Sequence, residues 1–205
     1  MKLYYGAGSC SMSCKIAIEE VKLQADCKLI DFDVEQDAKE VQQLNPLGAL
    51  PIAIINGKTM TQNIAILEYI ADQNPGSPLL PQTGTWERTE VMRWLSFTAS
   101  DLHKAFSPLF GLKQIFSQSS TQIEVRQWSE KSIHELLAVA ENQLNGKEYL
   151  TGSNFTIADA YFYVVVSWTK WVDISISKYK NLESYMRRVT ERPAVAKTLK
   201  EAGLA

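Results

Sequence analysis

Cysteine and histidine are scarce in this chain of 205 residues, which has three of the first and two of the second. They do not stand at the spacings that zinc sites use, so the sequence predicts no metal site. Three cysteines without a secretory signal are typical of a reducing compartment, which predicts a cytoplasmic protein.

Long apolar runs and blocks of basic charge are also missing. The longest apolar run lies within residues 160–168 and is too short to span a bilayer. The formal net charge is -2 and there is no basic cluster, so we expect neither a membrane nor a nucleic acid as a partner. With 45% hydrophobic and 21% charged residues, the composition is that of an ordinary globular protein.

The first part of the chain alternates strand-like runs with helical patterns. The predicted order is strand, helix, strand, weak helix, strand, strand and helix, over about 3–5, 11–21, 28–33, 34–44, 52–55, 58–60 and from 63 onward. Asn56-Gly57 is the strongest short signal for a β-hairpin. Asn63 is expected as the N-cap of the last helix.

Residues 74–84 are rich in proline and glycine. They connect a part with alternating strand and helix patterns to a part with helical patterns only. They predict a boundary between one domain at 1–81 and a second at 86–205. The second part is helical throughout, with helices expected at about 86–106, 122–144, 158–172, 182–190 and after Pro193. Pro108 is expected to end or kink the first of them. Thr156 and Asp159 have capping-box spacing and are interpreted as a structural cap.

Cys10 stands between a strand-like run with two glycines and the start of a helix. Free amide N–H groups and the positive end of the helix dipole at such a turn favour a thiolate, either that of Cys10 or one brought by a ligand. On position alone, a small buried residue explains Cys10 equally well. Cys14 lies one turn further on and is interpreted as structural, and no motif surrounds Cys27.

Two further stretches complement the Cys10 turn. Leu50-Pro51 precedes a strand, and Gln62-Asn63 begins a helix whose N–H groups would receive a carboxylate. Together the three stretches describe a site for a small anionic peptide whose sulfur lies near Cys10.

These motifs, in this order and spacing, resemble the cytosolic glutathione S-transferases, and the bacterial beta class most of all. The matching segments span the chain, at 1–5, 9–11, 45–51, 62–69, 102–110, 155–161 and 191–195. The resemblance implies an α/β thioredoxin-like N-terminal domain followed by an all-α helical C-terminal domain. It also implies a homodimer, with glutathione as co-substrate and a small hydrophobic electrophile as the second substrate.

The resemblance further implies roles for individual residues. Cys10 and His103 are the implied catalytic residues, with Cys10 against the glutathione sulfur and able to form a mixed disulfide. The implied glutathione-binding residues are Cys10, Leu50, Pro51, Gln62, Asn63, Ser96, Ser100 and His103. The weaker candidates are Tyr5, Ser11, Glu35 and Lys104. Ser96, Ser100 and His103 are four and three residues apart, so they are expected on one face of a helix.

The chain departs from the beta-class pattern at three positions. Gln62 replaces the usual glutamate, which removes a negative charge near the ammonium group of glutathione. Glu35 replaces a common lysine, with Lys39 as the nearest substitute, and Ser96 replaces a common asparagine. These departures bear on glutathione affinity more than on the fold.

The predicted activity is conjugation of the glutathione thiolate to hydrophobic electrophiles, with thiol–disulfide chemistry at Cys10. One alternative is a glutathione-dependent isomerase, dehalogenase or disulfide reductase on the same fold, because Ser9-Cys10-Ser11 also occurs in the isomerase-like class. Another is a partner-binding protein without activity. The presence of Cys10, Pro51 and His103 argues against that last alternative.

Overall fold

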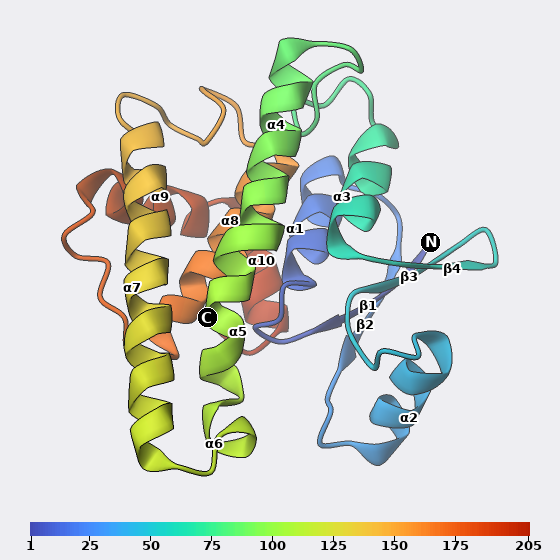
Figure 1. Cartoon of the computed structure of the whole chain (residues 1–205). Helices are drawn as coiled ribbons and strands as arrows, with labels where there is room; N and C mark the ends of the chain where they lie inside the picture. The colour runs from blue at the N-terminus through green and yellow to red at the C-terminus, as the bar shows by residue number, and fades with distance from the viewer.

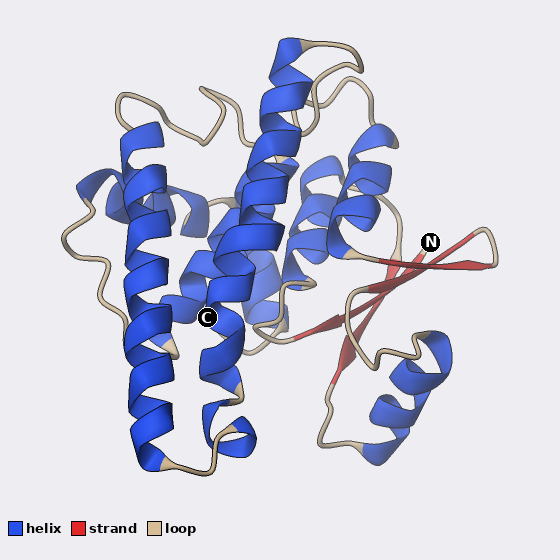
Figure 2. Ribbon diagram, in the orientation of Figure 1, coloured by secondary structure: helices blue, strands red, loops and turns tan.

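The computed structural model describes all 205 residues, with a small sheet and its helices on one side and a larger group of helices on the other (Figures 1 and 2). The strands are β1 (Lys2–Gly6), β2 (Asp26–Ile30), β3 (Ile52–Ile55) and β4 (Lys58–Thr61). The helices of this part are α1 (Met12–Val21), α2 (Glu35–Leu44) and α3 (Asn63–Asp72). The order of elements is the predicted one.

The four strands form a mixed sheet in the order β2-β1-β3-β4. β1 and β2 are parallel, whereas β3 is antiparallel to both β1 and β4. The hairpin between β3 and β4 turns at Asn56 and Gly57, whose φ angles of 51° and 76° are the two positive values that a tight type I′ turn needs. The prediction of a strand at 28–33 was wrong at both ends, because β2 pairs residue for residue with β1, and β1 ends at Gly6.

Alternate side chains of β1 face opposite sides of the sheet. Leu3 and Tyr5 belong to the large core that includes α1 and α3, whereas Tyr4 packs with Ile30, Val41 and Ile52 under α2. Helix α2 therefore lies alone on the far face of the sheet (Figure 1). Val41 is its one buried residue, which explains its weak helical pattern in the sequence.

The second part of the chain is entirely helical. Its elements are α4 (Trp86–Ser96), the π-helical segment η1 (Phe97–Leu102), α5 (His103–Phe110), α6 (Leu112–Ile115), α7 (Ser119–Gln143), α8 (Ile157–Ser167), the 3-10 turn η2 (Trp168–Lys170), α9 (Lys180–Thr190) and α10 (Pro193–Glu201). None of them combines the length and the apolarity needed to cross a membrane.

Two helix ends differ most from the prediction. α5 continues through Pro108 to Phe110, because the carbonyl that loses its N–H partner is that of Lys104, which is exposed to water. α8 ends at Ser167 rather than at 172, since the chain tightens there into η2.

The expected cap of α8 is confirmed. The Asp159 carboxylate accepts hydrogen bonds from the backbone N–H groups of Thr156 and Leu150, each at 2.9 Å, and from the Tyr185 hydroxyl at 3.2 Å. Asp159 is fully buried, and burial raises its pKa to about 6. The cap fixes α8 as the buried centre of the helical part, and α1 packs against it. The domain division between 81 and 86 stays a prediction.

Candidate active site

Cys10 lies in the turn between β1 and α1, and the helical part of the chain holds this turn. The Trp168 indole N–H donates to the Gly8 carbonyl oxygen at 2.7 Å. Gly8 has a φ of +70°, and a Cβ atom there would lie 1.7 Å from the Trp171 ring. Within the turn, the Ser11 hydroxyl accepts the Gly6 N–H at 2.9 Å. The position of Cys10 therefore depends on residues from both parts of the chain.

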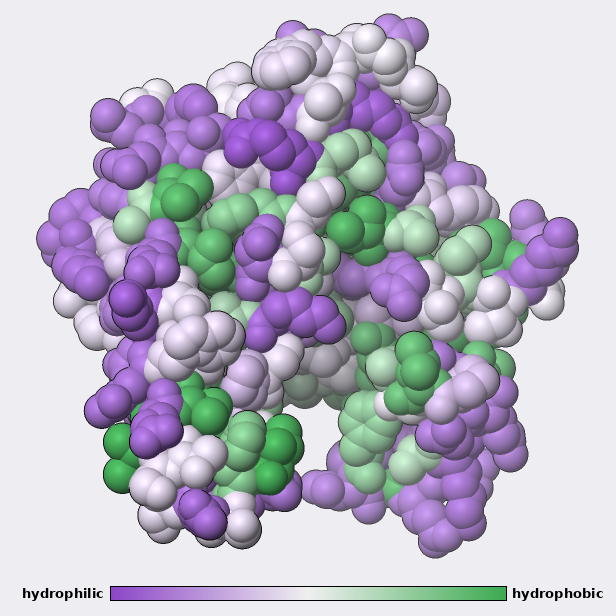
Figure 3. Space-filling model, viewed as in Figure 1, coloured by the Kyte–Doolittle hydropathy of each residue, from purple (hydrophilic) through white to green (hydrophobic).

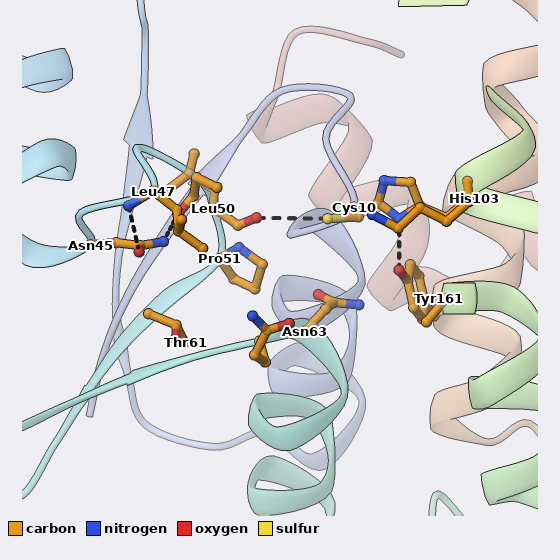
Figure 4. Close-up of a pocket in the computed structure, with 13 residues that line it drawn as sticks. Cys10, Asn45, Leu47, Leu50, Pro51, Thr61, Asn63, His103 and Tyr161 are labelled. Atoms are coloured by element: carbon orange, nitrogen blue, oxygen red, sulfur yellow. Dashed lines mark hydrogen bonds between the residues drawn. The ribbon is translucent and has the colours of Figure 1, made fainter. Parts of the chain in front are cut away.

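The Cys10 thiol lies 3.7 Å from the Leu50 carbonyl oxygen, to which it donates a hydrogen bond (Figure 4). Burial raises the pKa of Cys10 to about 11, although the backbone N–H groups of Cys10 and Ser11 act in the opposite direction. Of the two thiolates that the sequence left open, this favours one brought by a ligand over that of Cys10. Loss of hydration outweighs two N–H groups at a helix that begins only at Met12.

The loop at 45–51 brings main-chain groups to face Cys10. The Asn45 side chain ties the loop together, since it accepts the Leu47 N–H at 3.1 Å and donates to the Ala49 carbonyl at 2.7 Å. The Leu50–Pro51 peptide bond is cis. The Leu50 carbonyl points at Cys10 (Figure 4).

Gln62 and Asn63 occupy the start of α3, but the N-cap residue is not the expected one. Gln62 is the N-cap residue, with a φ of 75°, and Asn63 is the first helical residue, so the prediction of Asn63 as the N-cap was wrong. The Asn63 side chain is buried, where it donates to the Ser13 hydroxyl at 2.9 Å and accepts from the Cys14 thiol at 3.2 Å. Cys14 is fully buried, so its structural interpretation is confirmed.

His103 faces Cys10 from the helical part of the chain (Figure 4). Its Nδ1 atom lies 2.7 Å from the Tyr161 hydroxyl oxygen, and its ring packs against the Trp168 ring at 4.7 Å between centroids. Burial, with a smaller effect from the Lys104 charge, lowers the pKa of His103 to about 4. The imidazole is therefore neutral at physiological pH.

Two cavities meet at Cys10 and His103, which line both of them. The first cavity, of about 270 Å³, is also lined by Asn45, Leu47, Ala49, Leu50, Pro51, Thr61, Gln62, Asn63, Ala99, Lys104 and Tyr161. The second, of about 350 Å³, is also lined by Ala7, Gly8, Ser9, Phe110, Trp168 and Trp171. The molecular surface has a deep notch between the lobe of α2 and the lobe of α6 and α7 (Figure 3). We call the two spaces the polar cavity and the aromatic cavity.

Ser96 and Ser100 do not line either cavity. Their hydroxyls donate to the carbonyls of Met92 and Ser96 on their own helix, at 2.9 and 2.7 Å. The sequence spacing assumed an α-helix, but η1 is a π-helix with more residues per turn, which rotates His103 away from the line of Ser96 and Ser100. The π-helix thus places Ala99, rather than either serine, beside His103 in the polar cavity.

The weaker candidates are scattered. Lys104 lines the polar cavity, whereas Tyr5 lies elsewhere in the core and lines a separate cavity with Lys15. Ser11 is buried within the Cys10 turn. Glu35 is exposed at the start of α2, in an ion pair with Lys39.

Sequence reasoning missed several lining residues. Asn45 and Tyr161 lie inside matched segments, but no role follows for them from the sequence. Trp168 and Trp171 lie outside those segments, and aromatic residues at helical spacing are usually packing residues. No group of three histidine, cysteine or acidic side chains that could hold a metal ion occurs in the structure.

A thioredoxin-like domain whose cis-proline loop faces a cysteine is joined to an all-helical domain that supplies a histidine, which is the arrangement that the sequence resemblance implies. The family model for the glutathione S-transferase N-terminal domain matches residues 1–72, and the model for the C-terminal domain matches residues 99–193. The chain belongs to the glutathione S-transferase family, as its resemblance predicted.

Relatives of known structure match over the full length. A sphingomonad glutathione S-transferase complexed with glutathione is 36% identical, with a TM-score of 0.88 and complete coverage of both chains. A bacterial beta class enzyme from Sphingomonas chungbukensis has the same identity, TM-score and coverage. Among curated proteins, glutathione S-transferase GstA of Escherichia coli O157:H7 is 29% identical over 100% of each chain.

Proposed function

We propose that the chain binds glutathione in the polar cavity and bonds its thiol sulfur to a small electrophile in the aromatic cavity. The observation that carries this proposal is that Cys10 and His103 line both cavities. A glutathione sulfur placed beside them could therefore be reached by an electrophile in the aromatic cavity. The known complex of a similar sphingomonad protein with glutathione supports the choice of thiol.

The polar cavity offers main-chain groups to a peptide ligand. The Leu50 carbonyl, now occupied by the Cys10 thiol, would accept the cysteinyl N–H of glutathione. The free N–H groups at the start of α3, at Gln62 and Asn63, would hold the γ-glutamyl carboxylate. Glutathione would thereby release the Cys10 thiol from Leu50 and leave its S–H free to donate to the glutathione sulfur.

The reaction follows from this placement. The glutathione thiol loses its proton to solvent, and the thiolate attacks the electrophilic carbon. A C–S bond forms, and the leaving group departs with the pair of electrons of the bond that breaks. Cys10 acts as a hydrogen-bond donor to the sulfur, because its own pKa of about 11 keeps it protonated. Exchange through a mixed disulfide requires Cys10 to lose that proton first.

The aromatic cavity favours an uncharged, apolar electrophile. Phe110 and Trp168 meet edge to face at 5.2 Å between centroids, and Trp171 covers the Gly8 side. Apart from the neutral His103, its lining contains no ionisable side chain other than Cys10. A charged substrate would lose its hydration there without gaining a partner.

Calorimetry with glutathione, followed by a conjugation assay with an aromatic chloride, tests this function. Binding with turnover supports the transferase. Binding without conjugation favours isomerase, dehalogenase or disulfide reductase chemistry. No binding at millimolar glutathione contradicts the proposal and favours a protein that binds a partner without catalysis.

We further propose that the chain forms a homodimer in the cytoplasm, as its resemblance implies. Exposed apolar side chains such as Met60 on β4 are compatible with such an assembly. Light scattering at micromolar concentration tests it, and a mass of one chain would contradict it.

A further inference from the structure

The Tyr161 hydroxyl is buried between the two parts of the active site. Tyr161 belongs to α8, is 2% exposed, and its ring meets the His103 ring nearly at right angles. The hydroxyl has a single hydrogen-bond partner in the chain, which is Nδ1 of His103 at 2.7 Å (Figure 4). The mechanism above assigns no role to this contact.

The direction of the hydrogen bond between Tyr161 and His103 follows from which of the two groups carries a proton and which can accept one. Burial raises the pKa of Tyr161 and lowers that of His103, so the phenol keeps its proton and the imidazole carries only one. A buried hydroxyl proton needs an acceptor, and Nδ1 is the one within reach. The Tyr161 O–H therefore donates to Nδ1, and the single imidazole proton resides on Nε2.

The Nε2 atom is the free end of this arrangement. It makes no hydrogen bond within the chain, and His103 lines both cavities together with Cys10. Trp168 packs against the same ring at 4.7 Å and 79°, which limits its rotation. A fixed ring with an unpartnered N–H thus stands beside the place where the reacting sulfur would lie.

We propose that Tyr161 is a positioning residue, whose hydroxyl holds His103 in the Nε2–H tautomer so that this N–H donates to the glutathione sulfur. This inference rests on the proposed function for its ligand, but the tautomer itself is a property of the free protein. Without the hydroxyl, the ring stays in place against Trp168, yet its proton is free to move to Nδ1. The donor that faces the sulfur is then lost in part of the molecules.

The second histidine of the chain supplies a natural control. His134 Nδ1 also faces a tyrosine hydroxyl, that of Tyr179, at 3.2 Å. However, the Tyr179 hydroxyl donates its proton to the His134 carbonyl oxygen at 2.8 Å. It therefore has no proton left for the ring, and His134 lies outside both cavities. Tyr179→Phe matches Tyr161→Phe in chemistry without the proposed effect.

The first test is nitrogen NMR of the histidine side chains in the free protein, which distinguishes a protonated ring nitrogen from an unprotonated one. We expect His103 to show the Nε2–H form alone in the wild type and a mixture in Tyr161→Phe. Tyr179→Phe should leave the His103 signals unchanged. An Nδ1–H form in the wild type, or no change in Tyr161→Phe, would overturn the inference.

The second test is kinetic. We expect Tyr161→Phe to lower kcat about threefold, in proportion to the molecules whose imidazole proton has moved to Nδ1, while KM for glutathione stays unchanged. Because Tyr161 acts through His103, the same change should add no further loss in a His103→Ala background. Equal losses in both backgrounds would mean a structural role and would contradict the inference. Failure of the wild type to bind glutathione would instead contradict the proposed function and leave the NMR result to decide the tautomer.

Discussion

The two cavities that meet at Cys10 are built in different ways. The polar cavity is shaped by main chain, through the Asn45 loop, the Leu50 carbonyl and the start of α3. The aromatic cavity is shaped by the rings of Trp168 and Trp171. Main-chain groups persist when side chains change, whereas every ring substitution reshapes a pocket. The comparison teaches that one fold can keep its hold on glutathione while its second substrate varies.

The largest expected effect distinguishes thiol–disulfide exchange from conjugation, the two reactions that could take place where the cavities meet. Cys10→Ala should abolish thiol–disulfide exchange, at least about a thousandfold, because the exchanging sulfur is gone. Conjugation should fall only about tenfold, since it loses one hydrogen bond to the glutathione sulfur. Both rates are measured on the same preparation, with Cys27→Ala as a control. Equal, complete loss of both activities would contradict the split.

The protonation of Cys10 gives the next largest effect. With a pKa of about 11, Cys10 should react with iodoacetamide at pH 7 on the order of a hundredfold more slowly than an ordinary cysteine. Because the thiolate is the reactive form, the rate should rise about tenfold per pH unit and level off only near pH 11. Mass spectrometry of the Cys10 peptide follows it. A plateau below pH 8 would show that the helix start outweighs burial after all.

A substitution at Gly8 should damage the aromatic cavity and spare the polar one. Gly8→Ala forces Trp171 to move, since the new Cβ would lie 1.7 Å from its ring. We expect KM for the electrophile to rise about tenfold, on the order of the loss of one packed aromatic contact. The glutathione affinity should stay within about twofold. Gly57→Ala is the matched control, because Gly57 also has a positive φ, of +76°, but no neighbour within 4 Å.

A negative charge introduced at Gln62 should strengthen glutathione binding in the polar cavity and leave the aromatic cavity unchanged. Gln62→Glu places a carboxylate near the ammonium group of glutathione, at an exposed position where such pairs contribute about 0.2–1 kcal/mol. The affinity should therefore rise up to about fivefold at low salt and less at high salt, as calorimetry would record. Gln73→Glu, at the exposed far end of α3, adds the same charge and should change nothing. Equal gains from both variants would point to net charge rather than to the site.

The smallest effect on either cavity is expected from the cap of α8. Asp159→Ala removes the acceptor of the Thr156 and Leu150 N–H groups, so the free energy of unfolding should fall by about 2 kcal/mol. Both KM values should stay unchanged, because Asp159 lines neither cavity. Thermal unfolding and steady-state kinetics check this. Unchanged stability would contradict the cap.

Much of the fold could be predicted because its signals are local. Asn56-Gly57 needs only its own backbone to form the hairpin, and Thr156 lies three residues from Asp159. The predictions failed where residues far apart in the sequence determine the local structure. The Asn63 side chain turns to Ser13, 50 residues away, and no local pattern announces that contact. The sequence also failed to predict which residues of η1 face the polar cavity, because a π-helical turn has no distinct apolar spacing.

The sequence by itself determined the order of the elements, the Cys10 turn, the paired motifs at 45–51 and 62–69, and thereby the family. Only the tertiary structure decided the chemical state of the active site. Cys10 is a thiol because burial and a carbonyl 40 residues away surround it, and its turn is held by an indole 160 residues away. Protonation depends on hydration and hydrogen-bond partners, and these exist only once the two parts of the chain have packed together.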